Sequence, residues 1–304
     1  CYTPHPLCVM AAEEVQNYLS KQSDWQEELS QGKMFGVLIV QTEDGSIGYL
    51  TAFSGILAGK NIHPYFVPPV YDLLQPQGFF KIEEENISAI NRRIRRLEED
   101  KKYIDLRSNL TQTTQSAQDA LSIAKIQLKE AKDKRELLRK TGQLDAKEEA
   151  DLIRESQFQK AEYKRLERSW KDKIASLQVE AGNWEKQIQE LKAERKVRSA
   201  ALQQQLFEQF RMLNYRGEAI TLCDIFEQTV HKTPPAGAGE CAAPKLLQQA
   251  YLHHWKPIAM AEFWWGNSPK NEVRHHGYYY PACKGKCEPI LRHMLQGLEV
   301  EANP

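Results

Sequence analysis

The sequence lacks both a net charge and a long apolar segment. Its 304 residues include 41 basic and 41 acidic side chains. Phosphate binding is driven by Lys and Arg that displace counterions, so this balance argues against a strongly basic nucleic-acid module working alone, while local basic patches stay possible. The longest apolar run, residues 35–40, is far shorter than the ~20 residues that cross a bilayer. We therefore expect no membrane span.

Secretory features are also missing. Residue 1 is Cys rather than Met, and no charged-then-apolar signal segment follows it. We expect the chain to be part of a longer protein, with some of the function located elsewhere. The six cysteines are an even number, which is compatible with disulfides. In a long, charge-rich chain without secretory features, however, reduced thiols or a metal site are favoured, and the cytoplasm is the expected compartment.

Three regions differ in composition, and they predict an α+β fold. Residues 1–82 and 214–304 are mixed in composition and read as the two halves of one small α/β module, which the polar, repetitive residues 83–213 interrupt. In the first half, residues 11–29 have helical spacing and Gly32 ends the helix. Residues 34–41 and 47–53 predict two strands of a hairpin, because Asp44-Gly45 supplies the positive φ of a tight turn.

The middle region predicts a long antiparallel coiled-coil hairpin, because its apolar residues repeat every seven positions and it contains no proline. A turn is expected at residues 140–145, with Gly142 ending one helix in a left-handed conformation and Asp145 with Glu148 capping the next. Residues 108–118 are rich in Thr and Gln and predict a kink or a loose segment. The apolar repeat runs through Tyr163, Trp170, Leu177, Trp184 and Leu191, with Ile174, Ala181, Ile188 and Leu202 at companion positions.

A turn near Gln143 brings two groups of basic residues to the same level of the hairpin, and we call them the basic collar. Its members are Arg92, Arg93, Arg95, Arg96, Lys192, Arg195, Lys196 and Arg198. One interpretation is contact with RNA phosphates. The other is an ordinary solvated helix surface, neutralised by neighbouring acids at Glu98, Glu99, Asp100, Glu190 and Glu194.

The last region carries most of the candidate chemistry. A helix is expected to begin at Glu240 or Cys241, a buried strand covers residues 257–265, and a final helix begins near Cys287. Thiolates are stabilised at helix N-termini, and sulfur with imidazole suits zinc. Three cysteines and one histidine would complete a tetrahedral site, although the chain has one Cys-x-x-x-Cys and no pair of Cys-x-x-Cys motifs. The candidate ligands are Cys241, His275, His276, Cys283 and Cys287, and the alternative is that Cys283 and Cys287 are packing thiols.

This order of elements resembles the core of the zinc-dependent nucleoside deaminases. That family uses His or Cys, one residue, then Glu, followed by Pro-Cys-x-x-Cys, and its Glu transfers protons for a zinc-bound hydroxide. Here Cys241 is followed by Ala242 and Ala243, and Glu240 precedes it. The resemblance therefore implies a degenerate deaminase-like scaffold rather than an active deaminase.

Three further features have two interpretations each. The loop at residues 237–239 precedes a helix and could hold a phosphate, but without a P-loop lysine it is better explained as a flexible helix entry. Cys241 with His275 or His276 could form a nucleophile–base pair. The aromatic residues at 264–265 and 278–280 could stack on bases or belong to the core.

Several stretches of the sequence together resemble the long N-terminal region of bacterial RluA-type pseudouridine synthases. They are residues 1–8 (CYTPHPLC), 237–247 (GAGECAAPKLL), 259–266 (AMAEFWWG), 274–277 (RHHG) and 280–287 (YPACKGKC), together with the coiled-coil insertion. The likeness spans essentially the whole chain, although that region has no motif of established function.

The resemblance implies an accessory region of an RNA-modifying enzyme. In that family an Asp of an Arg-Leu-Asp loop acts on the target uridine without a cofactor, and this chain has no Arg-Leu-Asp, only the reversed Asp105-Leu106-Arg107. We therefore expect no catalytic residue here and a role in positioning structured RNA, ribosomal RNA or tRNA. The alternatives are a zinc-binding deaminase-like domain and a coiled-coil module for protein interaction or homodimerisation.

Overall fold

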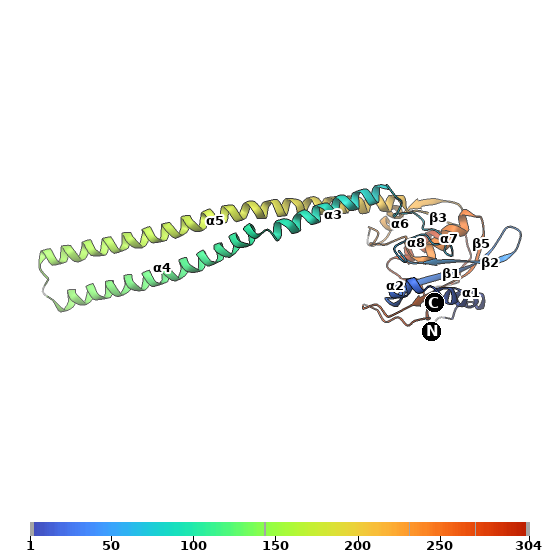
Figure 1. The fold of residues 1–304 in the computed structure, drawn as a ribbon, viewed down its shortest axis with the longest axis horizontal. Helices are drawn as coiled ribbons and strands as arrows, with labels where there is room; N and C mark the ends of the chain where they lie inside the picture. Colours follow the sequence, from blue (N-terminus) through green and yellow to red (C-terminus); the bar gives the residue numbers. More distant parts are fainter. Residues whose placement is uncertain (1–2, 143, 231, 271, 302–304) are drawn as a thin grey trace. The chain divides into compact units, whose positions relative to one another are not determined.

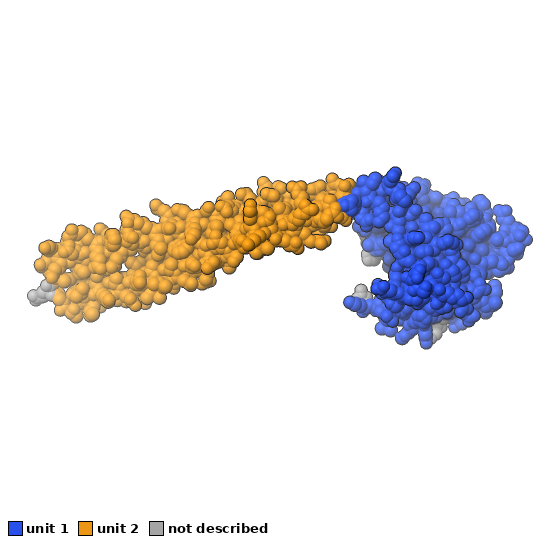
Figure 2. Space-filling model, viewed as in Figure 1, with its two compact units in different colours: residues 1–85, 199–304 blue, residues 86–198 orange. Residues whose placement is uncertain are grey.

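A computed structural model describes residues 3–142, 144–230, 232–270 and 272–301. The chain forms two compact units (Figures 1 and 2). Unit 1 contains residues 1–85 and 199–304, and unit 2, which we call the arm, contains residues 86–198. The fold is mixed α/β, with a small antiparallel sheet and very long helices.

The centre of unit 1 is a four-stranded antiparallel sheet in the order β2-β1-β5-β6. Its strands are β1 (Lys33–Gln41), β2 (Ile47–Phe53), β5 (Lys256–Trp265) and β6 (Tyr279–Tyr280). The predicted hairpin is confirmed: β1 pairs with β2, and Gly45 has φ 88° in the turn between them. β5 then pairs along the other edge of β1, which makes β1 a central strand built from a continuous apolar run.

Helices cover both faces of this sheet, because alternate residues of β1 point in opposite directions. Phe35, Val37 and Ile39 pack with α1 (Pro6–Ser20), while Leu38 and Val40 pack with α7 (Ala242–Leu252) and α8 (Cys287–Met294). The α7 face also receives α6 (Leu222–Glu227) and the small hairpin of β3 (Arg211–Leu213) and β4 (Ala219–Thr221).

The helix predicted over residues 11–29 is instead two helices. α1 begins at Pro6, where the missing proline N–H costs nothing, and ends at Ser20. A 3-10 turn, η1 (Ser23–Trp25), leads into α2 (Gln26–Ser30). The Gln26 side chain donates to the Leu19 and Gln22 carbonyl groups and so satisfies acceptors that the break exposes.

Three helices contribute to the arm: α3 (Phe79–Glu98), α4 (Lys101–Thr141) and α5 (Ala146–Gln209). The kink or loose segment predicted at residues 108–118 is wrong, because α4 is continuous there and buries Thr113 and Ala117. Thr111 and Thr114 donate their hydroxyl groups to carbonyl groups four residues earlier and therefore stay compatible with the helix. The interruption lies at residues 99–100, where Asp100 caps α4 by accepting from the Lys102 N–H.

At the far end of the arm, the predicted cap at the start of α5 is confirmed, whereas the predicted conformation of Gly142 at the end of α4 is wrong. Asp145 accepts from the Glu148 N–H, and the Glu148 carboxylate accepts from the Asp145 N–H, which is the predicted capping box. Gly142 ends α4 but is extended, with φ −111°, rather than left-handed. Gln143, the predicted turning point, lies outside the described residues.

Side-chain contacts show that the two legs of the arm are antiparallel (Figure 1). Arg139 bonds Glu149 near the turn, and Arg135 bonds Gln159 further back. The rings of Tyr103 and Trp184 stack with centroids 5.7 Å apart. A small core at the other end of the arm contains Ile94, Tyr103, Ile188 and Leu191.

Candidate functional site

Two helix starts in unit 1 bring three cysteines together. Cys241 is the N-cap of α7, and Cys287 is the first residue of α8. The Cys287 thiol lies close enough to the Cys241 and Cys283 side chains for both of them to raise its pKa. In addition, the Cys287 backbone N–H donates to the Cys283 Sγ at 3.3 Å. We call these three residues the thiol cluster, in which Cys241 comes from a segment more than 40 positions before Cys283 and Cys287.

The pKa values of Cys283 and Cys287 are shifted in opposite directions. Hydrogen bonds from the Cys287 side chain and from the start of α8 lower the pKa of Cys283 to about 5. Hydrogen bonds to Cys241 and Cys283, together with burial, raise the pKa of Cys287. Cys287 is 4% exposed, whereas Cys241 and Cys283 are half-buried. Of these two thiols, Cys283 therefore ionises more readily than Cys287.

A buried carboxylate lies beside the thiol cluster. Glu262 belongs to β5 and is 6% exposed, on the face that α7 and α8 cover. Its Oε1 accepts from the Ala243 N–H at 3.2 Å, in the first turn of α7. Burial raises the pKa of Glu262 to about 7, and the nearby Cys283 adds to this increase. The Glu262 carboxylate thus lies next to Ala243, the position at which the deaminase pattern has its Glu.

The close approach of α7 to the sheet depends on a glycine. A Cβ added at Gly36 in β1 would lie 3.0 Å from Leu246 Cδ1 and 3.1 Å from the Ala242 Cβ. Because the neighbouring strand carries Glu262 opposite Gly36, the missing side chain leaves room for the carboxylate between strand and helix.

Lys245 is a second buried charge in α7. It is 2% exposed, and its Nζ donates to the carbonyl oxygens of Phe53 at 2.8 Å and Gly55 at 3.3 Å. Burial lowers the pKa of Lys245 to about 8. The Gly55 N–H also donates to the Glu240 carbonyl oxygen, so three hydrogen bonds join residues 53–55 to residues 240–245.

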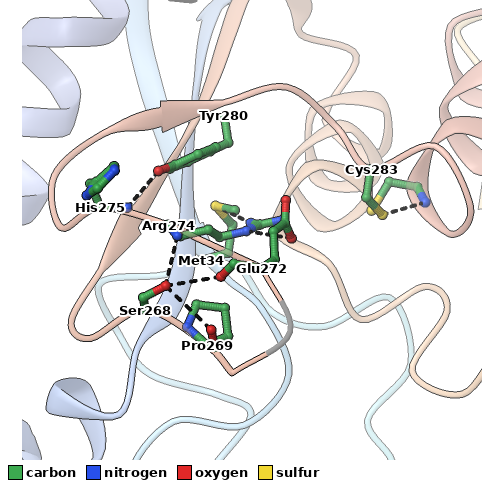
Figure 3. Close-up of polar contacts among 9 residues, drawn as sticks. Met34, Ser268, Pro269, Glu272, Arg274, His275, Tyr280 and Cys283 are labelled. Atoms are coloured by element: carbon green, nitrogen blue, oxygen red, sulfur yellow. Dashed lines mark hydrogen bonds and ion pairs between the residues drawn. The ribbon is translucent and has the colours of Figure 1, made fainter.

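The two predicted histidine ligands lie in the loop before β6. The His275 backbone N–H donates to the Tyr280 hydroxyl group at 2.6 Å, and the His275 ring lies 5.2 Å from the Tyr278 ring. The His276 Nδ1 accepts from the Gly266 N–H at 3.0 Å. Figure 3 shows His275 and Cys283 well apart, with Arg274 drawn between them. Arg274 pairs with Glu272 and packs over the Trp264 and Tyr280 rings. The structure therefore gathers the three predicted cysteines but places the histidines in a separate loop.

The remaining features of this region have structural roles. Gly239 has φ 85°, and an added Cβ would lie 2.7 Å from Phe210, so the loop before α7 is packed against the core. The Trp264 indole N–H donates to the Asn267 carbonyl oxygen, and Trp265 packs on His276. In the described part of the chain, no group of three or more His, Cys, Asp or Glu side chains lies where it could hold a metal ion.

The basic collar lies in the arm, and its members have different surroundings. Lys192 pairs with Glu98 at 2.7 Å, Arg198 pairs with Glu194 at 3.1 Å, and Arg195 donates to the Asn91 side chain. Arg93, Arg95 and Arg96 are exposed and take part in no ion pair with any described residue. Arg95 and Arg96 lie in the last turn of α3, where cations also favour the helix dipole.

A scan against protein-family models and searches of curated proteins and of solved structures each found no match to this chain. Among the described helices, none combines the length and apolar character needed to span a bilayer.

Sequence reasoning overlooked Glu262 and Lys245, although each leaves a visible signal. Glu262 is the one charged residue between Pro257 and Trp265, within a strand whose other charged residue, Lys256, is exposed at its first position. Lys245 likewise stands within the apolar start of α7. A charge at a position that the periodicity assigns to the core needs a partner, so both residues could have been marked as site candidates.

Proposed function

We propose that this chain is the RNA-positioning region of an enzyme that isomerises uridine to pseudouridine in structured RNA. Ribosomal RNA is the favoured substrate and tRNA the alternative. The observation that carries the proposal is that Arg93, Arg95 and Arg96 are exposed and form no ion pair with any described residue, within an electrically neutral chain. The sequence resemblance to RluA-type synthases supports it. No residue here is assigned to the isomerisation, which needs no cofactor.

The chemistry of these arginines suits RNA phosphates. Each guanidinium group has a planar set of donors that can bind a phosphate with two hydrogen bonds. Ion pairs with Glu98 and Glu194 offset the charges of Lys192 and Arg198. No described acidic side chain forms such a pair with Arg93, Arg95 or Arg96. Free cysteines at positions 8, 223, 241, 283 and 287 suit a reducing compartment, and we place the enzyme in the cytoplasm.

The test is RNA binding by a variant that carries Arg93→Gln, Arg95→Gln and Arg96→Gln. Each lost phosphate contact should lower the slope of log Kd against log salt by about 0.7–0.9, so the slope should fall by roughly 2 to 3. Fluorescence anisotropy over a salt series measures this slope. The matched control carries Lys125→Gln, Lys129→Gln and Lys134→Gln, three exposed positions of α4. If both variants bind RNA like the parent chain, the arginines have no such role.

Within this proposal the arm is an antiparallel coiled coil, and its pairing of α3 with α5 keeps the two groups of collar residues next to each other. The burial pattern supports it, because Ala181, Ile188 and Leu191 are buried and Tyr163, Trp170 and Leu177 are half-buried, while their neighbours are mostly exposed. The three arginines occupy positions beside or outside this seam, where side chains remain free for a ligand.

Homodimerisation through the arm is a second candidate function. Phe158, Leu137 and Ile153 are 63%, 60% and 44% exposed, which is high for large apolar side chains. Light scattering of the parent chain and of a Phe158→Ser, Leu137→Ser variant separates the possibilities. A mass that halves in the variant supports the dimer, and a parent chain with the mass of one copy removes it.

A deaminase-like scaffold is the second candidate for unit 1. The order α1, β1, β2, α7, β5, α8 and the cysteines at the starts of α7 and α8 favour it. Ala243 stands where a deaminase has its proton-transferring carboxylate, so we propose a scaffold derived from that fold rather than an active deaminase. Incubation of the purified chain with cytidine and adenosine tests this, because released ammonia would contradict a non-catalytic scaffold.

A further inference from the structure

We propose that one side of α5 binds the phosphates of a double-stranded RNA stem along the arm. This inference rests on the proposed function and adds to it the form of the RNA. The residues concerned, which we call the basic stripe, are Lys160, Lys164, Arg168, Lys171, Lys186 and Lys196. Lys196 is also a member of the basic collar, so the stripe continues from the collar towards the turn of the arm.

The charge of the chain is divided unequally between its two units. Of the 41 basic and 41 acidic residues, the arm contains 27 and 20, and unit 1 contains the remaining 14 and 21. The arm therefore has a formal charge of +7 and unit 1 a formal charge of −7. A polyanion is attracted to the arm and repelled by unit 1, although the chain as a whole is neutral.

The stripe residues lie on a side of α5 that carries no acid. Fourteen exposed positions of α5 follow one another at intervals of three or four residues, close to the 3.6 residues of a helical turn, and so share one side. Six of the fourteen residues are basic and none is acidic. The positions are 153, 157, 160, 164, 168, 171, 175, 178, 182, 186, 189, 193, 196 and 200.

Acidic residues form a separate row on α5. Trp170 and Ile188 mark the side of the helix that packs within the arm. At about 100° per residue, the fourteen positions lie about 80–160° to one side of this direction, and Glu155, Glu162 and Glu180 lie about 60–80° to the other. The basic row and the acidic row therefore lie on opposite sides of the packed surface.

The side chains of the stripe are not neutralised within the chain. None of the six forms an ion pair or a side-chain hydrogen bond with any described residue, and neither does Glu167 at the edge of the stripe. On other sides of α5, by contrast, Arg154 pairs with Asp151 and Arg165 pairs with Glu162. The six cations are thus available to an external anion.

The length and composition of the stripe favour a double helix over a single strand. From Lys160 to Lys196 it extends about 54 Å at about 1.5 Å per residue, within one continuous helix. Single-stranded RNA is usually bound with aromatic side chains on which the bases stack, and none of the fourteen positions is aromatic. Duplex RNA is recognised mainly through its shape and its backbone, which a long row of cations suits. Between positions 160 and 196 the row also has no large apolar side chain that a protein interface or a lipid surface would need.

The experiment measures binding of the whole chain to an RNA duplex of about 20 base pairs and to one of its strands, by fluorescence anisotropy over a salt series. The stripe variant carries Lys160→Gln, Lys164→Gln, Arg168→Gln and Lys171→Gln. Because four phosphate contacts are lost, its slope of log Kd against log salt for the duplex should fall by roughly 3 to 4. The parent chain should bind the duplex roughly tenfold more tightly than the strand, since the duplex has the higher charge density. Equal affinity for the two RNAs would overturn the assignment to a double-stranded stem.

The matched control removes four positive charges from other sides of the same helix. It carries Lys147→Gln, Arg154→Gln, Arg165→Gln and Lys173→Gln, all at exposed positions. Its slope should change by less than about 1, because these residues lie away from the stripe. Equal losses in the two variants would mean that only the total charge of the arm matters, and the stripe would be wrong.

A second pair of variants adds charge instead of removing it. Ala175→Glu with Gln178→Glu places two acids inside the stripe and should weaken duplex binding. Ser176→Glu with Asn183→Glu places two acids at exposed positions outside it and should have a smaller effect. Equal effects of the two pairs would contradict a binding surface confined to one side of α5.

These results separate the stripe from the collar. If the variant at Arg93, Arg95 and Arg96 has a lower slope and the stripe variant binds the duplex like the parent chain, the collar stands and the stripe is wrong. If the parent chain binds neither RNA, both are wrong. Glutamine and glutamate are good helix formers at exposed positions, so circular dichroism should show the same helix content in every variant.

Discussion

Charged side chains differ between the two units in their burial and in their hydrogen-bond partners. In unit 1, Glu262 and Lys245 are almost completely buried and contact backbone groups. In the arm, charged residues are mostly exposed and pair with neighbours three or four positions away, as Arg154 does with Asp151 and Arg165 with Glu162. Exposed pairs of this kind contribute little to stability, whereas a buried charge costs free energy unless it has a partner.

This contrast decides where a functional signal can be recognised. A charged residue in the arm means little by itself, because a helix with a narrow apolar seam must cover its other sides with polar side chains. Among the described residues of the arm, the local excess at Arg93, Arg95 and Arg96 and the buried Arg135 stand out. In unit 1 a single buried carboxylate is informative. The predictions that follow test the contrast, beginning with the largest expected effect.

The largest effect is expected in the core of unit 1. Phe263 is fully buried and its ring lies 5.8 Å from that of Phe35. Phe263→Ala should lower the free energy of unfolding of unit 1 by about 3–5 kcal/mol, because it removes apolar contacts and leaves a cavity. Urea denaturation followed by tryptophan fluorescence measures the change. Phe158→Ala in the arm, which is 63% exposed, is the control and should cost less than about 0.5 kcal/mol.

The next effect is the pH dependence that Lys245 introduces. Its pKa is about 8 in the folded chain and 10.5 as the ordinary value, so the unfolded chain binds the additional proton between these pH values. Stability should therefore rise as the pH increases from 8 to 10.5, by at most about 3 kcal/mol at about 1.4 kcal/mol per pH unit. Lys245→Met should remove this part of the dependence. Denaturation curves of both chains across this range give the difference, and parallel curves would contradict the buried, charged lysine.

A smaller effect is expected in the small core of the arm. Ile188 is 5% exposed and packs with Ile94, Tyr103 and Leu191. Ile188→Ala should destabilise the arm by about 2 kcal/mol, at the low end for buried isoleucine because a two-helix seam collapses easily around a missing side chain. Hydrogen exchange of the α5 amides reports this change. Val179→Ala, at a 66% exposed position of the same helix, should leave the exchange rates unchanged.

The smallest effect concerns the cap at the turn of the arm. Asp145→Ala removes the side chain that accepts from the Lys147 and Glu148 N–H groups and should cost about 1 kcal/mol locally. Faster exchange confined to the first turns of α5 is the expected observation. Asp133→Ala, an exposed acid within α4, is the control for the loss of one negative charge. Equal effects of the two substitutions would mean that the cap contributes only its charge.

Local patterns predicted much of this fold. The Asp44-Gly45 turn, the strand ending at Trp265, the helix that Cys241 caps and the capping box at Asp145 all depend on residues close together in sequence. Such signals predict where elements begin and end, because backbone hydrogen bonding and φ preferences act over a few residues.

The errors arose where distant contacts decide the structure. Thr113 and Ala117 lie in a segment with weak helix signals, yet both are buried within the arm and α4 continues through them. Likewise, spacing alone could not show that Cys241 contacts Cys287 or that His276 bonds Gly266 instead. The candidate site could therefore be predicted only in part from the sequence. Glu262, the buried carboxylate beside the thiol cluster, comes from a strand that local patterns assign to the apolar core.

The pairing of β1 with β5 has a consequence for synthesis of the protein. Phe35 pairs with Phe263, so the ribosome adds more than 200 residues between the two partners. During that interval the edge of β1 that later pairs with β5 is also unpaired, which is a hazard for misassociation. The intervening helices rely on contacts within the arm, and their antiparallel return brings Asn91 and Arg195 together. If the arm forms early on the nascent chain, it would reduce the effective loop length between β1 and β5 and so speed their pairing.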